Sequence, residues 1–145
     1  MWRGMIVFAG LLGAAGAAHA DSRLFCSADD AQARFTLESG FANEGGHRLN
    51  HFRGALIVKD PAQAAFAKRL FESQHLSNHW SRDGELLLEV FDGGGDDTSG
   101  ATLDLVVVAG ARGKPAANFS GTYSLTIEGG SKPYAAEGKV SCGTK

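Results

Sequence analysis

No stretch of this 145-residue sequence is apolar for long enough to cross a membrane as a helix. The most apolar run, Met5–Leu12, gives way to glycine and alanine. It comes after the base Arg3 and is followed by Ala18-His19-Ala20, the order of charged segment, apolar segment and small-residue cleavage site that is typical of a secretory signal peptide. We therefore expect residues 1–20 to be a cleaved signal peptide, and residues 21–145 to form a single secreted or periplasmic domain.

The sequence also has no excess of basic residues. It contains 14 Lys and Arg against 16 Asp and Glu, and removal of the signal peptide with its Arg3 leaves 13 against 16. This balance argues against a nucleic-acid partner, because the phosphate backbone requires a basic face. We expect the partner to be a protein or a small-molecule ligand, with no nucleic acid and no membrane span after cleavage.

Cysteine is scarce, with only Cys26 and Cys142, and the C-x-x-C spacing of many metal and redox sites is absent. Both residues belong to the part of the chain that would be exported to an oxidising compartment, so we expect one disulfide between the first and last strands. Closing a loop of this size stabilises a fold by roughly 4–5 kcal/mol in the chain-entropy model. The alternatives are two free thiols or a metal-binding pair.

What the sequence does contain is a succession of short apolar stretches separated by Gly, Asn, Asp and Ser, as in antiparallel strands joined by turns. Residues 101–109 carry apolar side chains on both faces, which predicts a central strand buried on two sides or one covered by the helix. The pattern predicts a mainly β fold, an antiparallel β-sandwich with a small β-barrel as the alternative, because periodicity does not separate the two. The expected strands are 24–27, 33–38, 48–59, 75–80, 85–91, 101–109, 118–127 and 134–142.

One segment predicts a short covering α-helix instead. Asp60 suits the N-cap and Pro61 the first helical position. Three apolar residues at a spacing of four would form its buried stripe, namely Ala62, Phe66 and Leu70. We expect this helix to lie on the sheet and to cover one end of the core.

Two histidine pairs share the same spacing: His47 with His51, and His75 with His79. A spacing of four places both imidazoles on one face of a helix or a strand, so the four side chains could converge on zinc or copper. In a reduced version one pair is completed by Asp83 or Glu44. The simpler interpretation is four surface histidines with a coincidental spacing.

A second candidate cation site is the glycine-rich loop that contains Asp92, Asp96 and Asp97. Carboxylates and backbone carbonyls in such a loop suit calcium, but the order of ligands in an EF-hand is absent. The alternative is a mobile hairpin loop whose charges keep it solvated.

Catalytic motifs are missing: there is no G-x-S-x-G, and both cysteines are assigned to the disulfide. The aromatic residues Trp80, Phe91, Tyr123 and Tyr134 are expected in the core or in cross-strand pairs, although in a barrel some would line a cavity. We therefore expect an exported, non-catalytic binding or interaction protein. The alternatives are a secreted metal-binding protein that uses the paired histidines, and a small secreted hydrolase whose site is not apparent.

Overall fold

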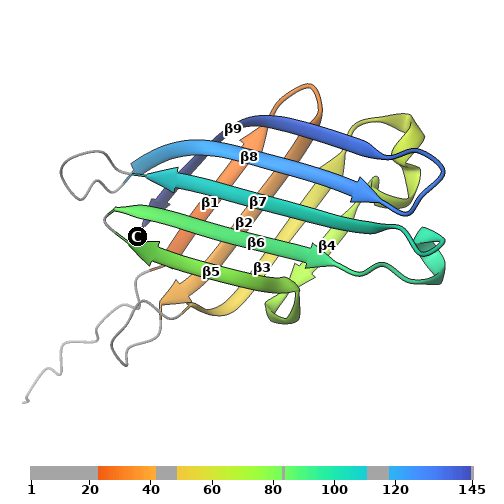
Figure 1. Ribbon diagram of the computed structural model, residues 1–145. Helices are drawn as coiled ribbons and strands as arrows, with labels where there is room; N and C mark the ends of the chain where they lie inside the picture. Colours follow the sequence, from red (N-terminus) through yellow and green to blue (C-terminus); the bar gives the residue numbers. More distant parts are fainter. Residues whose placement is uncertain (1–22, 42–48, 83, 111–117, 145) are drawn as a thin grey trace, which may run out of the picture.

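The computed structural model describes residues 23–41, 49–82, 84–110 and 118–144 (Figure 1). The predicted signal peptide lies outside the described residues. Nine strands and three 3₁₀ turns make up the described chain. The strands are β1 (Arg23–Asp29), β2 (Ala33–Phe41), β3 (Leu49–Val58), β4 (Arg69–Glu72), β5 (Leu76–Arg82), β6 (Glu85–Asp92), β7 (Thr102–Gly110), β8 (Asn118–Glu128) and β9 (Tyr134–Thr144), and the turns are η1 (Pro61–Phe66), η2 (Ser73–His75) and η3 (Asp96–Thr98).

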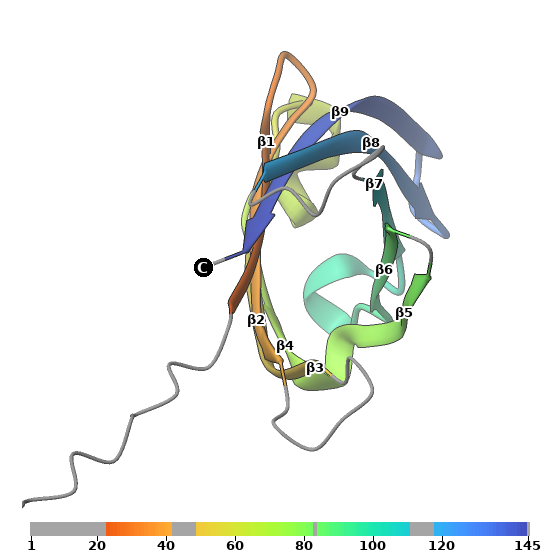
Figure 2. The same ribbon diagram turned by 90° about the vertical axis from the view of Figure 1, so that its left-hand side faces the viewer.

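All nine strands belong to one antiparallel sheet in the order β4-β3-β2-β1-β9-β8-β7-β6-β5. The sheet curls into a nearly closed barrel, with β1–β4 on one side and β5–β9 on the other (Figures 1 and 2). The two edge strands, β4 and β5, are consecutive in the chain and are joined by η2. The mainly β prediction is confirmed, and the barrel alternative describes the architecture better than the sandwich because the pairing of β1 with β9 makes the sheet continuous.

Alternation along each strand places one set of side chains inside the barrel. In β7 the inner residues Leu103, Leu105 and Val107 have no exposed surface, whereas Val108 on the outer face is 38% exposed. The expected burial of both faces of this strand is therefore wrong. Its apolar outer residues face away from the core, which leaves an apolar area on the outside of the molecule.

The predicted α-helix is corrected to a 3₁₀ turn followed by a strand. The side chain of Asp60 caps η1 as expected by accepting a hydrogen bond from the backbone N–H of Ala62 at 2.8 Å, but the turn ends at Phe66. The chain then pairs with the outer edge of β3 as β4. Leu70 consequently points outward and is 65% exposed, while Phe71 beside it is buried.

The predicted disulfide between Cys26 and Cys142 is present. The two cysteines are directly opposite each other in the β1–β9 pair, with their Cα atoms 4.0 Å apart, and both are buried. The bond therefore joins the two sides of the barrel where the first strand meets the last. A disulfide of this kind indicates an oxidising compartment. None of the helical segments in the described part of the chain is long and apolar enough to span a membrane.

Candidate functional site

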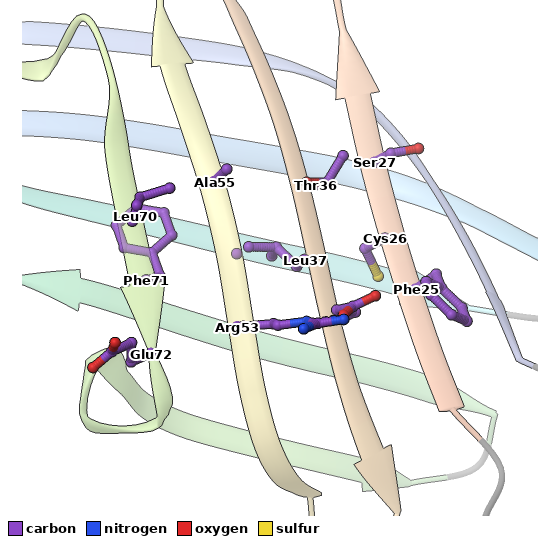
Figure 3. Close-up of a pocket in the computed structure, with 12 residues that line it drawn as sticks. Phe25, Cys26, Ser27, Thr36, Leu37, Arg53, Ala55, Leu70, Phe71 and Glu72 are labelled. Atoms are coloured by element: carbon purple, nitrogen blue, oxygen red, sulfur yellow. Dashed lines mark hydrogen bonds and ion pairs between the residues drawn. The ribbon is translucent and has the colours of Figure 1, made fainter.

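A shallow groove of about 690 Å³ crosses the outer face of β1–β4 (Figure 3). Its centre is a row of outward-facing residues, one from each strand, that lie directly opposite one another across the sheet. The row consists of Ser27, Thr36, Ala55 and Leu70. Adjacent strands are about 4.8 Å apart, so the row extends roughly 14 Å across the strands.

The depth of the groove comes from small side chains in its middle and larger ones at its ends. Thr36 and Ala55 form the floor, and Leu70 rises at the β4 end. Phe25 contributes at the β1 end. Gly54 lies next to the floor, and only a glycine fits at this position because a Cβ atom would lie 2.6 Å from Leu37 Cδ2.

Ion pairs flank the groove on both sides. On one side the carboxylate of Glu38 accepts hydrogen bonds from Arg23, at 3.4 Å, and from Arg53. On the other side Asp29 pairs with Arg34 at 3.3 Å and with Lys59 at 2.7 Å. In each group one carboxylate is shared by two cations, and Glu72, a further acid that lines the groove, lies opposite Arg53.

No family model, curated protein or solved structure matches this chain. The groove geometry itself is suited to non-covalent binding, because it combines an apolar floor with charged groups at its margins. Sequence reasoning missed this site. The four residues of its central row come from four strands, and Leu70 also fits the stripe of the expected helix.

The residues predicted to bind zinc or copper lie in different places. His47 and its alternative companions Glu44 and Asp83 are outside the described residues. His51 is exposed on β3, His75 lies in η2, and His79 lies on β5.

Contrary to the expectation, His75 and His79 therefore do not share one strand face. The Nδ1 atom of His75 accepts a hydrogen bond from the backbone N–H of Glu72 at 2.9 Å, and its ring lies 5.7 Å from that of Phe71. Among the described residues, no three His, Cys, Asp or Glu side chains are grouped as a metal site. Because His47 is not described, the metal site stays a prediction.

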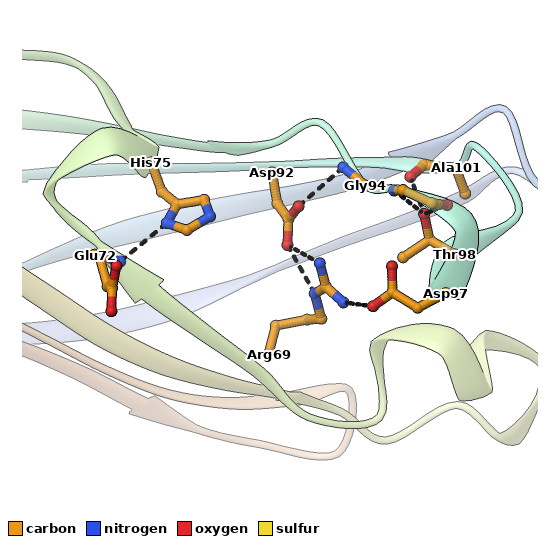
Figure 4. Close-up of polar contacts among 9 residues, drawn as sticks. Arg69, Glu72, His75, Asp92, Gly94, Asp97, Thr98 and Ala101 are labelled. Carbon is orange, nitrogen blue, oxygen red and sulfur yellow. Dashed lines mark hydrogen bonds and ion pairs between the residues drawn. The ribbon is translucent and has the colours of Figure 1, made fainter.

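The acidic loop is organised around a cation from a distant strand (Figure 4). Arg69 on β4 donates to Asp92 Oδ2 at 2.7 Å and to Asp97 Oδ2 at 2.5 Å, and its guanidinium lies 5.5 Å from the centroid of the Phe66 ring. The other carboxylate oxygen of Asp92 accepts the Gly94 N–H at 2.9 Å. The loop joins the adjacent antiparallel strands β6 and β7, and Arg69 ties it to β4 while Asp96 and Asp97 stay exposed.

The calcium prediction is not tested by this arrangement. Two of its three carboxylates, Asp92 and Asp97, bind Arg69, and Asp96 is exposed in η3. The side chain of Thr98 supports the turn by accepting from the Gly95 N–H at 3.0 Å and donating to the carbonyl of Ala101 at 2.9 Å.

Tyr123, one of the candidate aromatic residues, lies in the core. Its hydroxyl donates to Asp30 Oδ2 at 2.6 Å, and its ring packs edge-on against Phe35 with centroids 5.1 Å apart. Gly138 lies directly opposite, and a Cβ atom there would be 2.5 Å from the tyrosine ring. The hydrogen bond ties the turn between β1 and β2 to the middle of β8.

This contact changes the pKa of both partners. Burial raises the pKa of Tyr123, and the hydrogen bond to Asp30 raises it further. Burial also tends to raise the pKa of Asp30, but hydrogen bonds from Tyr123 and from the backbone N–H groups of Ala33 and Gln32 outweigh burial, so that its pKa lies below the usual 3.8. The pair is thus a neutral phenol that donates to an ionised carboxylate, an arrangement that supports the fold.

Proposed function

We propose that this protein is an exported, non-catalytic binding protein that holds an apolar portion of its ligand in the groove across β1–β4. The observation that carries the proposal is the exposure of Leu70, which is 65% accessible beside the small residues Thr36 and Ala55. A large aliphatic side chain left exposed next to a depression is stabilised when a ligand covers it. The groove volume falls within the usual range of ligand sites.

The charged margins give the groove a means of orienting its ligand. Arg53, whose side chain is 68% exposed, lies opposite Glu72 of β4 at one margin. Polar groups at the edge of an apolar site fix the position of a ligand more than they add affinity. We expect an elongated ligand with an apolar body close to 14 Å in length that lies across the four strands and carries polar groups along its sides.

Export is supported by two separate features of the chain. The first 20 residues have the composition of a signal peptide. The disulfide between Cys26 and Cys142 fits an oxidising compartment. Expression of the full chain in a secreting host, followed by mass spectrometry of the released protein, should give a mass that begins at residue 21; retention of the leader would contradict export.

The groove itself is tested with a fluorescent apolar probe, N-phenyl-1-naphthylamine, titrated into the mature protein. In the variant Ala55→Glu a charged side chain occupies the floor, and we expect the probe affinity to fall at least about tenfold, corresponding to the loss of one well-buried apolar group. Ile57→Ser is the matched control, because Ile57 is 38% exposed on the same strand but does not line the groove. Equal affinity for the parent protein and Ala55→Glu would reject the groove as the binding site.

A further inference from the structure

A second hollow, of about 440 Å³, lies on the outer face where β1 and β2 adjoin β9. Its exposed lining residues, here called the polar hollow, are three with hydroxyl groups, two bases and one acid: Ser27, Thr36, Ser141, Arg34, Lys139 and Asp29. Ser27 and Thr36 also line the groove, so the polar hollow is continuous with the groove at its β1 end (Figure 3). A ligand that lies in the groove can therefore extend into a polar surrounding without leaving the protein.

The hydroxyl groups of the polar hollow prolong the central row of the groove onto β9. Thr36 lies directly opposite Ser27, and Ser27 lies directly opposite Ser141. All three side chains are exposed, and none of their hydroxyls forms a hydrogen bond with another described residue. Because a hydroxyl rotates freely and can donate one hydrogen bond, neighbouring hydroxyls of this kind can donate to one anionic group placed between them.

Lys139 gives the polar hollow a cation that has no counter-ion. Its side chain is exposed on the outer face of β9 and forms no ion pair with a described residue. Arg34, by contrast, pairs with Asp29, whose carboxylate also binds Lys59. Glu137, the next outward-facing residue of β9, does not line the polar hollow and makes no ion pair with a described residue either. One ammonium group is thus left without a matching carboxylate among the residues that line the polar hollow.

Another exposed apolar area, on β5 and β6, lies among acids instead. Trp80 and Phe91, two of the aromatic residues expected in the core, are on the surface there and are 40% and 45% exposed. Phe91 lies directly opposite Asp104, whose pKa is raised by burial and by the nearby charges of Glu89 and Glu128. This area disfavours a second negative charge, so an anion with an apolar chain is better accommodated by the groove and the polar hollow.

We propose that the ligand is a fatty acid, whose carboxylate binds in the polar hollow and whose alkyl chain lies along the groove toward Leu70. This inference rests on the proposed function, because it names the class of ligand for the same groove. The carboxylate accepts hydrogen bonds from the Lys139 ammonium group and from the hydroxyls of Ser27 and Ser141, so that one negative charge meets the one unmatched cation. The central row spans roughly 14 Å from Ser27 to Leu70, which suits an extended chain of about twelve carbons.

Displacement of N-phenyl-1-naphthylamine from the mature protein by laurate and by dodecan-1-ol tests this assignment. Both competitors have twelve carbons and differ only in the head group, so a difference in affinity reports on the polar hollow. We expect laurate to bind the parent protein at least about tenfold more tightly, because hydrogen bonds to a charged group are stronger than those between neutral groups. Equal affinities for the two competitors would overturn the proposal.

Lys139→Met removes the charge and keeps an unbranched side chain. We expect its affinity for laurate to fall about tenfold, to that for dodecan-1-ol, while its affinity for the probe stays unchanged; Lys139→Arg should retain the preference for laurate. Lys132→Met is the matched control, since Lys132 is an exposed lysine in the turn between β8 and β9 and lines neither the groove nor the polar hollow. A preference for laurate that persists in Lys139→Met, folded as judged by circular dichroism, would overturn the proposal.

The same measurements separate this inference from the proposed function. A parent protein that binds the probe at the groove but does not prefer laurate would overturn only the fatty-acid assignment, whereas a parent protein that does not bind the probe would reject the groove itself. Dodecyl phosphate that binds more tightly than laurate would overturn the choice of a carboxylate head group. Phe91→Ser, in the other exposed apolar area, should bind laurate like the parent protein, and a lower affinity would place the ligand on the wrong face.

Discussion

The outer faces of β1–β4 and of β6–β9 are built from the same kind of strand but differ in how their charged side chains are paired. On the outer face of β1–β4, residues of opposite sign lie across from each other, as Glu38 does from Arg53, and form ion pairs. On the outer face of β6–β9, Asp104 has Glu89 and Glu128 as diagonal neighbours and no ion pair among the described side chains. The first face therefore neutralises much of its charge internally, whereas on the second the carboxylates repel one another.

The two sides are also held together in different ways at their two junctions. At one junction β1 pairs with β9, and the disulfide crosses between them. At the other, β4 and β5 are edge strands, and Arg69 reaches from β4 to Asp92 at the end of β6. One junction thus depends on a covalent bond and the other on an ion pair, so each can be broken separately.

The largest effect is expected from removing the covalent junction. Cys26→Ala combined with Cys142→Ala should lower the free energy of unfolding by roughly 4–5 kcal/mol, because the unfolded chain is no longer closed into a loop. Urea denaturation measures this change. The double variant Ser27→Ala with Ser141→Ala, the adjacent exposed pair in the same ladder, is the control and should differ little from the parent protein. Equal urea midpoints for the cysteine variant and the parent would contradict the role given to the disulfide.

The next effect comes from the second junction. Arg69→Met leaves the carboxylate of Asp92, whose side chain is 5% exposed, without its cation. Removing one partner of a buried ion pair costs about 3 kcal/mol of unfolding free energy. Arg53→Met is the control, since the Arg53 side chain is 68% exposed and such surface pairs contribute less than about 1 kcal/mol. Similar losses in the two variants would show that the Arg69 junction is no stronger than the surface ion pairs of β1–β4.

A smaller, pH-dependent effect is expected at the contact between Tyr123 and Asp30. Tyr123→Phe should cost about 1–2 kcal/mol at neutral pH through loss of a hydrogen bond to a charged group. Because the pKa of Asp30 is lowered on folding, its contribution is present above its ordinary pKa of 3.8 and is lost as the pH falls below that value. Because the pKa of Tyr123 is raised on folding, its contribution is present below its ordinary pKa of 10.0 and is lost as the pH rises beyond it.

Thermal unfolding of the parent protein and Tyr123→Phe from pH 2 to 11 tests this behaviour. The difference between them should be greatest at intermediate pH and should shrink at both extremes. A difference that does not depend on pH would indicate that the variant acts only through packing.

The smallest effect has the opposite sign. Asp104→Asn should raise the free energy of unfolding at neutral pH by less than about 1 kcal/mol, because it removes a poorly solvated charge beside two glutamates on a partly exposed surface. Since the pKa of Asp104 is raised on folding, its charge is a cost above the ordinary pKa of 3.8, and the gain in the variant should vanish as the pH falls below that value. Urea midpoints at pH 3 and pH 7 measure this, with the exposed Glu137→Gln as control. A destabilised Asp104→Asn at neutral pH would show that the carboxylate has a stabilising partner.

The strands could be predicted where alternation and turn residues agree. The expected strand at 85–91 is observed as Glu85–Asp92, and that expected at 101–109 as Thr102–Gly110. The strand Arg69–Glu72 was missed because the spacing of Phe66 and Leu70 also fits one face of a helix. Pairing with the edge of β3 decided between these two conformations, and such pairing is not encoded in local spacing.

The candidate site was less predictable than the fold. The central row of the groove draws one residue from each of four strands, and its composition depends on the register between them. The role of Arg69 was hidden for a similar reason, since its carboxylate partners lie 23 and 28 residues away in the chain.

By itself the sequence determined the mainly β class, the inward-facing residues of the long strands and the pairing of its two cysteines. These depend on side-chain alternation and on the number of cysteines, which are local or compositional properties. The tertiary structure alone decided the closure of the sheet into a barrel, the conversion of the expected helix into an edge strand, and the assembly of the groove residues across β1–β4. These features depend on which strands become neighbours and in what register, and that is set by the burial of the whole core rather than by any one segment.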